Sequence, residues 1–449
     1  MPKAKNNLRG IPGVDTLLDA VGDCNLPRPL VVAAIREELA RLRKSKEIPA
    51  HDKIADAVRQ RLSDLALSRL QRVINGTGVV VHTNLGRSPV KAPTTATDGS
   101  GYVNLEIDLA TGRRGGRAIF VERCLAELCG AEAAMVANNC AAALVLILRH
   151  FTANKPEVLI SRGELVQIGG GFRIPDILET SGARLREVGT TNRTTIGDYT
   201  KATSKDTGLV LKVHRSNFFM DGFVAAPERG ELAALARKQR VPFVEDLGSG
   251  ALLPTEDWAN GHHEPTPAEV LKGGADLVCF SGDKLMGGPQ AGIIAGKARH
   301  VAALKKHPFF RALRCDKLVL GTLQETVEAH LDGRAKTLPL HASLQADPVQ
   351  LRKRAKRLAK AMEGLPVQVV MAEGESQVGG GALPQAKLAS VTLELVPDQL
   401  ALKDFAARLR RASVPVIGVI GGQRFRLDLR TIASSEEKAL LQSIKEVLT

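Results

Sequence analysis

Aromatic side chains are scarce in this sequence of 449 residues, which contains 1 Trp, 2 Tyr and 12 Phe. Protein surfaces that read unpaired RNA bases usually stack those bases on aromatic rings. The scarcity of aromatic residues argues against this mode of recognition. Any nucleic acid that binds the chain should therefore be held mainly through its phosphates and its shape.

Signals for export and membrane insertion are also missing. The basic segment of residues 1–10 is followed by polar sequence instead of an apolar segment, and no run of about 18 uncharged apolar residues occurs. The 6 cysteines form no CxxC pair, and most lie in apolar stretches where a reduced thiol acts as a small apolar side chain. We therefore expect a cytoplasmic protein without a membrane span.

Familiar motifs for nucleotides and metals are absent as well. The glycine-rich segment from Ile168 to Phe172 is not a GxGxxG motif, and no GxxxxGK[ST] accompanies it. His262, His263 and Glu264 lie in a proline-containing loop and lack the i, i+4 spacing of a zinc-binding helix. We interpret these three as surface residues and expect neither nucleotide chemistry nor a metal site.

The chain is strongly basic, with 62 Lys and Arg residues against 48 Asp and Glu and a formal charge of +14. An enzyme that acts on small neutral metabolites has no need for this excess. A polyanionic partner is the sharper interpretation, and a solvated basic surface is the alternative that charge alone leaves open.

Three regions with different patterns indicate the domain organisation. Residues 1–72 carry apolar residues at helical spacing, such as Leu30, Val31 and Ala34, which predicts a helical region. Residues 73–334 contain short apolar runs separated by helix-length segments, which predicts a large α/β domain with a mainly parallel, seven-stranded sheet. The runs are AAMVAN, EVLISR, RLREVG, GLVLKVH, FVEDLG, DLVCFSG and AGIIAGK.

Residues 335–449 show a third pattern, which predicts a small α+β domain. A basic helix should begin at Pro348, with Asp347 as its cap, and extend to Lys360. After it we expect a glycine-rich loop at 379–381, the strand ASVTLEL, the helix LALKDFAARLRRA, the strand RFRLDLRT and a last helix from about Ser435.

A single lysine follows the sixth apolar run, in the segment FSGDKLMGG. Ligands of parallel α/β sheets lie at the carboxyl ends of the strands, so Lys284 and the nearby Ser281 are expected at a cleft. Desolvation there lowers the pKa of an amine and makes it a nucleophile toward an aldehyde. Taken alone, a lysine after a strand is more often a surface residue.

Other candidates follow other strands. Asp246, in VEDLGSG, can keep a pyridine nitrogen protonated, although such an aspartate can also be a metal ligand or a helix cap. Asn139, Cys140 and Ala141 begin an alanine-rich helix whose N-terminus suits an anion, unless Asn139 is only an ordinary cap. Asn217, in VHRSN, can donate to a phenolic oxygen.

The order of these elements along the chain is more informative than any one of them. Helix N-terminus, asparagine, aspartate and lysine follow one another as they do in aminotransferase-type folds. The combination predicts a pyridoxal 5'-phosphate enzyme of this fold, with Lys284 joined to the cofactor.

Longer blocks extend the pattern over nearly the whole chain. They include INGTGVVVHTNLGRSPV, YVNLEIDLATGRRGGR, ISRGELVQIGGGFRIPDI, FSGDKLMGGPQAG and HPFFRALRCDKL, and they resemble bacterial selenocysteine synthase, L-seryl-tRNA(Sec) selenium transferase. The resemblance implies that the serine amino group of seryl-tRNA(Sec) displaces Lys284, which then removes the α-proton. Loss of the hydroxyl would leave an aminoacrylyl-tRNA, to which selenophosphate supplies selenium.

The resemblance also implies a set of anion-binding residues around the reacting serine. Position by position, the set is Arg87 in TNLGRS, Arg117 in RRGGR, and Arg311 with Arg314 in FFRALR. Because the last two stand three residues apart on an expected helix, they should face one pocket. The family further implies a homo-oligomer, a ring of dimers with active sites at subunit contacts, and N-terminal helices that bind the tRNA.

The sequence departs from the family pattern at three places. Cys140 stands where asparagine is common, residues 118–120 are unusually apolar, and Val419 replaces an arginine. An aminoacyl ester has no free α-carboxylate, so the missing arginine weakly favours a tRNA substrate. Arg430 is the nearest alternative for binding a carboxylate.

Two other functions stay open on sequence grounds. One is a lyase of the same family that uses the same cofactor on a small amino acid or a sugar-acid phosphate, and it would need neither the N-terminal helices nor the excess charge. The other is a non-enzymatic RNA-binding protein on a degenerate scaffold. In that case Asn217, Asp246 and Lys284 would not need to be intact.

Overall fold

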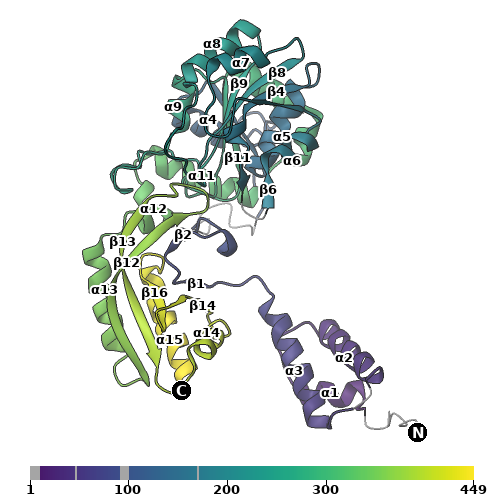
Figure 1. The fold of residues 1–449 in the computed structure, drawn as a ribbon. Coiled ribbons are helices and arrows are strands. Elements are labelled where there is room, and N and C mark those ends of the chain that lie inside the picture. The colour runs from purple at the N-terminus through teal and green to yellow at the C-terminus, as the bar shows by residue number, and fades with distance from the viewer. Residues whose placement is uncertain (1–10, 46–47, 92–100, 169–170) are drawn as a thin grey trace, which may run out of the picture. The chain divides into compact units, whose positions relative to one another are not determined.

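The computed structural model describes residues 11–45, 48–91, 101–168 and 171–449 (Figure 1). The segment of residues 1–10 and two glycines of the segment from Ile168 to Phe172 lie outside the described residues. The chain forms two compact units. One comprises the residues up to Val73 with Ser413–Pro415, and the other comprises Ile74–Ala412 with Val416–Thr449.

The first unit consists of the helices α1 (Val14–Val21), α2 (Arg28–Arg43) and α3 (His51–Leu67). Their apolar faces meet in a core in which Ile35 and Val58 are fully buried. The predicted helical pattern is present, but Leu30, its first apolar residue, is 47% exposed. The buried face of α2 starts one residue later, at Val31.

The main sheet of the second unit has the strand order β3-β11-β10-β9-β8-β4-β7. Strands β10, β9, β8, β4 and β7 are parallel to one another, and β11 is antiparallel to both β10 and β3. The prediction of seven mainly parallel strands is confirmed. The strands are β3 (Ala133–Ala137), β4 (Glu157–Ser161), β7 (Arg184–Val188), β8 (Thr207–Val213), β9 (Phe243–Gly248), β10 (Leu277–Ser281) and β11 (Gly292–Gly296).

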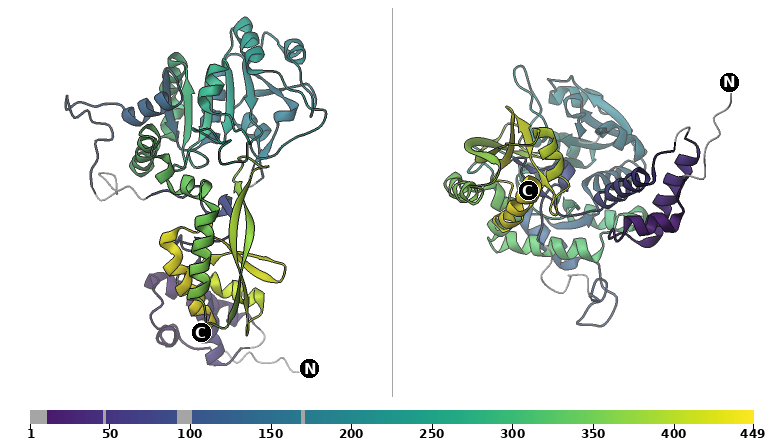
Figure 2. Two further views of the ribbon diagram at one scale, coloured as in Figure 1. Left: turned by 90° about the vertical axis from the view of Figure 1, so that its left-hand side faces the viewer. Right: turned by 90° about the horizontal axis from the view of Figure 1, so that it is seen from below.

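Helices cover both faces of this sheet (Figure 2). Successive strand residues enter opposite cores, so that Leu159 packs on one side and Val158 on the other. The first core contains residues of α4 (Ile119–Leu128), α7 (Ile196–Ala202), α8 (Arg229–Gln239), α9 (Pro267–Lys272) and α11 (Lys317–Leu331). The second contains residues of α5 (Cys140–Phe151), α6 (Ile174–Thr180) and α10 (Ala298–Lys306).

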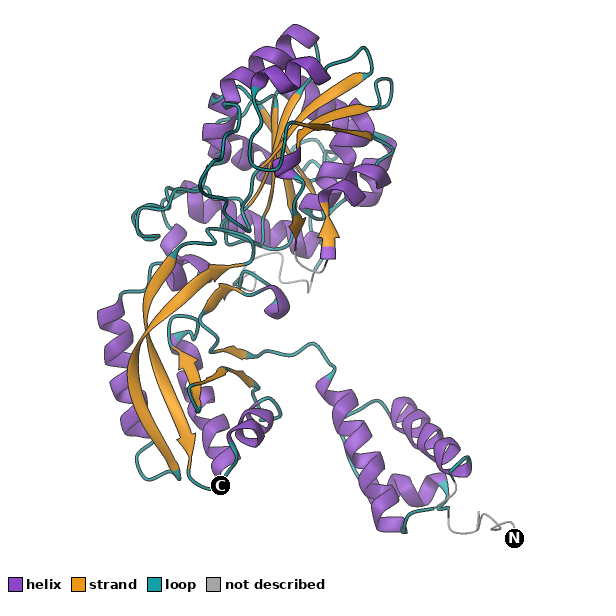
Figure 3. Ribbon diagram, viewed as in Figure 1, coloured by secondary structure: helices purple, strands orange, loops and turns teal. Residues whose placement is uncertain are grey.

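A second sheet has the order β15-β16-β13-β12-β2 (Figure 3). Its strands are β2 (Val79–Val81), β12 (Val367–Gly379), β13 (Lys387–Pro397), β15 (Val419–Gly421) and β16 (Arg424–Asp428). The helices of this region are α12 (Pro339–Leu344), α13 (Pro348–Ala361), α14 (Leu402–Leu409) and α15 (Glu437–Leu448). Asp347 caps α13 as expected, because its side chain accepts from the N–H of Val349 at 2.9 Å.

The second unit also contains several short elements. Two small sheets pair β1 (Ile74–Asn75) with β14 (Val416–Ile417) and β5 (Gln167–Ile168) with β6 (Phe172–Arg173). The 3-10 helices are η2 (Thr83–Leu85), η3 (Arg162–Glu164), η5 (Pro308–Leu313), η6 (Ala335–Thr337) and η7 (Ser434–Glu436). Among the described residues, no helix has the length and apolar character that crossing a membrane requires.

Candidate active site

A pocket of about 310 Å³ opens at the carboxyl ends of β8, β9 and β10. The start of α5 and part of α6 form a second, more apolar side, which includes Leu144 and Ile177. The sequence-predicted residues that line this pocket are Arg87, Asn139, Cys140, Ala141, Asn217, Asp246, Ser281 and Lys284.

Lys284 lies in the turn after β10 and is half-buried. Two glycines, Gly248 and Gly381, lie next to its amine. A Cβ atom on either would be in ordinary contact with Nζ, at 3.6 and 3.4 Å, so it is the positive φ angles of 65° and 80° that favour glycine at both positions. Within the described part of the chain the amine forms no ion pair.

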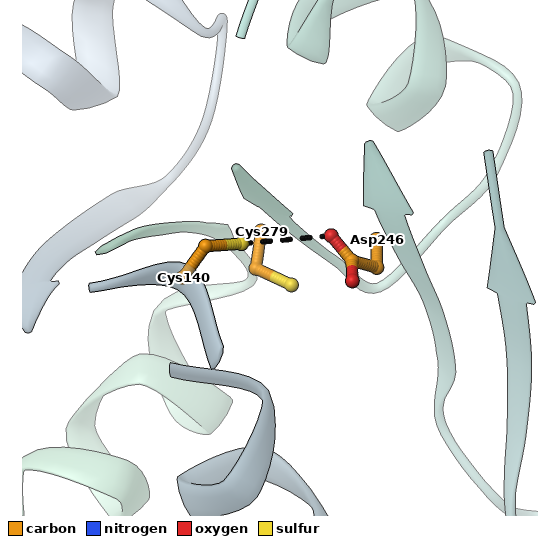
Figure 4. A group of neighbouring side chains, drawn as sticks. All are labelled: Cys140, Asp246 and Cys279. Carbon is orange, nitrogen blue, oxygen red and sulfur yellow. Dashed lines mark hydrogen bonds between the residues drawn. The ribbon is translucent and has the colours of Figure 1, made fainter. Parts of the chain in front are cut away.

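Asp246 is almost fully buried near the end of β9. Burial raises the pKa of its carboxyl group, while the charge of Lys284 and a hydrogen bond from Cys140 act in the opposite direction. The Cys140 thiol donates to Oδ1 at 3.5 Å (Figure 4). A carboxylate in this position can accept a hydrogen bond from the protonated ring nitrogen of a bound cofactor and so keep that nitrogen protonated.

The N-terminus of α5 forms another side of the pocket. The side chain of Asn139 caps the helix by accepting from the N–H of Ala142 at 2.8 Å. Cys140 and Ala141 line the pocket, and N–H groups in the first turn of a helix have no partner within the helix. A Cβ on Gly292 of β11 would lie 2.1 Å from the carbonyl oxygen of Asn139, so only glycine lets the helix begin this close to the sheet.

Asn217 follows β8 and lines the same pocket. Its Nδ2 donates to the carbonyl oxygen of Gln167 at 2.8 Å, which fixes the orientation of the amide group. The neighbouring His214 also lines the pocket, with Nε2 at 3.0 Å from Oε1 of Glu264. The interpretation of Glu264 as a surface residue is therefore wrong, because the residue is only 3% exposed.

Arg87 is held by a partner that the sequence did not reveal. Its Nη1 donates to both carboxylate oxygens of Asp283, at 3.2 and 2.9 Å, and Asp283 is buried next to Lys284. Arg87 has a positive φ angle of 64°, which is uncommon for a side chain of this size. The pair thus brings a guanidinium to the pocket through contacts between segments that are distant in sequence.

Arg117 and Arg314 do not line this pocket but another one. Arg117 donates to Oε1 of Glu106 at 2.9 Å and to the carbonyl oxygen of Cys315 at 2.6 Å, and Arg314 lies 3.6 Å from the same carboxylate. The hydrogen bond from Arg117 lowers the pKa of Glu106. In one chain, these arginines are therefore separate from the site that contains Lys284.

The expected helix with Arg311 and Arg314 on one face is wrong. Residues Pro308–Leu313 form the 3-10 helix η5, and Arg314 follows it with extended backbone angles. Arg311 is exposed, and Arg314 is half-buried beside the second pocket. Because a 3-10 helix has three residues per turn and this one ends at Leu313, Arg314 does not continue the face that carries Arg311.

Arg430 is not available to bind a carboxylate. The residue is 5% exposed, and its guanidinium donates to the carbonyl oxygens of Ser343, Leu344 and Ala389. It therefore has a structural role between α12 and β13.

The donor groups of the first pocket fit a cofactor that combines an aldehyde, a ring nitrogen and a phosphate. The amine of Lys284 and the carboxylate of Asp246 lie in one pocket, and the glycine at position 292 leaves room for the N-terminus of α5. A seven-stranded sheet with one antiparallel strand and a lysine at its carboxyl edge is the fold of aminotransferase-like enzymes. A solved D-glucosaminate-6-phosphate ammonia-lyase shares this fold with a TM-score of 0.56 at 21% identity, over 84% of this chain and 96% of that chain.

Sequence comparisons define the family. Residues 73–433 match the model described as L-seryl-tRNA selenium transferase, and residues 8–43 match the model for the N-terminal part of selenocysteine synthase. An L-seryl-tRNA(Sec) selenium transferase of Geobacter sulfurreducens is 44% identical over 97% of this chain and 98% of its own length. One of Aquifex aeolicus is 39% identical over 99% of this chain and its whole length. The chain belongs to the L-seryl-tRNA selenium transferase family.

Proposed function

We propose that this protein converts seryl-tRNA(Sec) to selenocysteinyl-tRNA(Sec), with pyridoxal 5'-phosphate bound at Lys284 and selenophosphate as selenium donor. Family membership supports the reaction. The observation that supports the chemistry is the convergence of Lys284, Asp246 and the N-terminus of α5 on one pocket. A bound pyridoxal ring would act as an electron sink for the α-carbon of the serine.

Each residue of the pocket then has a separate task. The amine of Lys284 holds the cofactor and, once displaced by the serine amino group, removes the α-proton. Asp246 holds the proton of the ring nitrogen. The backbone N–H groups of Cys140 and Ala141 bind the phosphate of the cofactor. Asn217 donates a hydrogen bond to its phenolic oxygen, and Ser281 is a further residue that contacts the cofactor.

The anion sites and the assembly form a second part of the proposal. Arg87 in the pocket, with Arg117, Arg311 and Arg314, would bind the selenium donor and the tRNA end. Because the last three lie outside the pocket of their own chain, we infer a homo-oligomer whose sites are completed by a second subunit. Large exposed apolar side chains near Arg117 support this, since Ile119 is 60% and Phe120 53% exposed.

We further propose that residues 1–72 bind the tRNA, that residues 73–334 form the cofactor domain, and that residues 335–449 form the small domain. The compact helical unit and the excess positive charge support the first assignment. A gel-shift assay with tRNA(Sec) tests it, because binding should be lost when residues 1–72 are deleted. A cytoplasmic location, where aminoacyl-tRNAs are used, goes with this proposal.

The decisive experiment incubates the protein with seryl-tRNA(Sec) and selenophosphate and identifies the amino acid released from the tRNA. Selenocysteine is expected, and recovery of serine alone would refute the proposal. The Lys284→Arg variant should lose the imine absorbance band of bound cofactor, because a guanidinium does not form an imine with the aldehyde. Lys297→Arg is the matched control, since Lys297 follows the antiparallel strand β11 and pairs with Asp276.

A further inference from the structure

Two thiols flank the carboxylate of Asp246 in the proposed cofactor site (Figure 4). Cys140 is the first residue of α5, and Cys279 lies on β10 directly opposite Asp246 in the β9–β10 register. The two sulfur atoms and a carboxylate oxygen all lie within 4.8 Å of one another. Three separate elements therefore bring these groups together, and two of the residues, Cys140 and Asp246, line the pocket.

The thiols are protonated donors in this environment. Contact with Cys140 and burial raise the pKa of Cys279 well above its ordinary value. For Cys140, contact with Cys279 lowers the pKa, but burial and the nearby charge of Asp246 raise it more. A thiophilic metal ion would require both thiols to lose their protons, which burial opposes, so we interpret the cluster as hydrogen-bonding and not as metal-binding.

We propose that Cys140 and Cys279 are positioning residues, whose S–H groups orient the carboxylate of Asp246 and set how strongly it holds the proton on the ring nitrogen of the cofactor. This inference rests on the proposed function. Cys140 fixes the carboxylate through Oδ1, and Cys279 supports Cys140 from the sheet.

The test measures two properties of the full-length protein with bound pyridoxal phosphate. One is the midpoint pH at which its visible absorbance changes, and the other is the dissociation constant of the cofactor. When the carboxylate of Asp246 is less well oriented, the ring nitrogen of the cofactor is less fully protonated. The ring then withdraws less electron density from the imine nitrogen that joins the cofactor to Lys284, so the pKa of that imine nitrogen is higher. The midpoint should therefore rise, by roughly half a pH unit in Cys140→Ala, and cofactor binding should weaken roughly three- to tenfold.

Variants separate this role from simple packing. Cys140→Ser keeps a donor and should keep the wild-type midpoint, and Cys279→Ala should shift it in the same direction as Cys140→Ala but less. Cys129→Ala removes a fully buried thiol of the other core and should leave the midpoint unchanged. If Cys140→Ala does not fold, as judged by circular dichroism, Cys279→Ala takes its place in the comparison.

The possible failures are distinguishable. A wild-type protein without a visible band, or one whose band survives in Lys284→Arg, would refute the proposed cofactor chemistry. A normal band in the wild type, with the same midpoint and affinity in Cys140→Ala and Cys279→Ala, would overturn the positioning role alone. A shift in Cys129→Ala equal to that in Cys140→Ala would also overturn it.

Discussion

Two buried histidines contact the turn that follows Lys284 and should make the protein sensitive to mild acid. His330 donates from Nε2 to the carbonyl oxygen of Met286 at 2.8 Å. The ring of His341 lies edge-to-face with that of His330, at 5.3 Å between centroids, and is 3% exposed. Burial, and then the neighbouring His330, lower the pKa of His341 from 6.5 to about 4.

The sign and size of the effect follow from these values. Above about pH 6.5 neither the folded nor the unfolded chain protonates this ring. Between pH 6.5 and about pH 4 the unfolded chain binds the proton and the folded chain does not, so the free energy of unfolding decreases as the pH falls. The contribution of His341 to this loss is about 2 kcal/mol at about pH 5 and approaches about 3 kcal/mol below pH 4.

The chain contains a suitable reporter for this region. Its single tryptophan, Trp258, packs against the core cluster that includes Leu340 and Leu344 of α12, the helix that carries His341. Urea unfolding followed by tryptophan fluorescence at about pH 7.5 and about pH 5 gives the acid loss. His341→Leu should lose about 2 kcal/mol less than the wild type, and His51→Gln, at an exposed histidine, should lose as much as the wild type. Equal acid losses in the wild type and His341→Leu would refute the reasoning.

Two further predictions concern contacts at the pocket. Arg87→Ala leaves the buried carboxylate of Asp283 without its partner and should lower the free energy of unfolding by about 2 kcal/mol. Adding Asp283→Asn should recover part of this loss in urea unfolding, and an additive double variant would contradict the pairing. Gly292→Ala places a Cβ 2.1 Å from the carbonyl oxygen of Asn139, so thermal unfolding should show a loss of more than about 3 kcal/mol. Gly230→Ala, where the Cβ meets nothing within 4 Å, should be neutral or slightly stabilising, and similar losses in both variants would count against the close approach.

The strands of the main sheet were predictable because helices cover both of its faces. The inner strands read as short continuous apolar runs, since successive side chains enter two different cores, whereas the edge strand β7 has the mixed sequence RLREV. Strand β12 lacks this signal. Helix α13 packs against the hairpin of β12 and β13, and β12 carries exposed residues such as Glu373 and Glu375. A strand that is exposed to solvent on one face, and that carries acidic residues separated by a glycine, lacks the apolar run by which the strands of the main sheet were recognised.

The pocket was predictable to the extent that position after a strand determines position in the fold. Asp246 and Lys284 end or follow neighbouring parallel strands, so they had to lie at one edge of the sheet. Which side chains meet within the site depends on the register of neighbouring strands and on contacts between segments that are distant in sequence. Cys279 lies beside Asp246 only because β9 and β10 pair as they do, and Arg87 meets Asp283 across 196 residues of sequence. No local pattern contains this information.

Arg117 lies outside the pocket that contains Lys284, and its surroundings suit an anion site at a contact between subunits. Its guanidinium is already oriented by Glu106 and by the carbonyl oxygen of Cys315, so it would lose little freedom on meeting an anion. That anion would have to approach from outside the lysine pocket of the same chain, because Arg117 and Arg314 line a different one. The exposed Ile119 and Phe120 follow Arg117 in the sequence, so apolar surface that a second subunit would cover adjoins the arginine. An assembly that buries this surface would place a preoriented guanidinium at the contact, which is what a substrate-anion site shared between subunits requires.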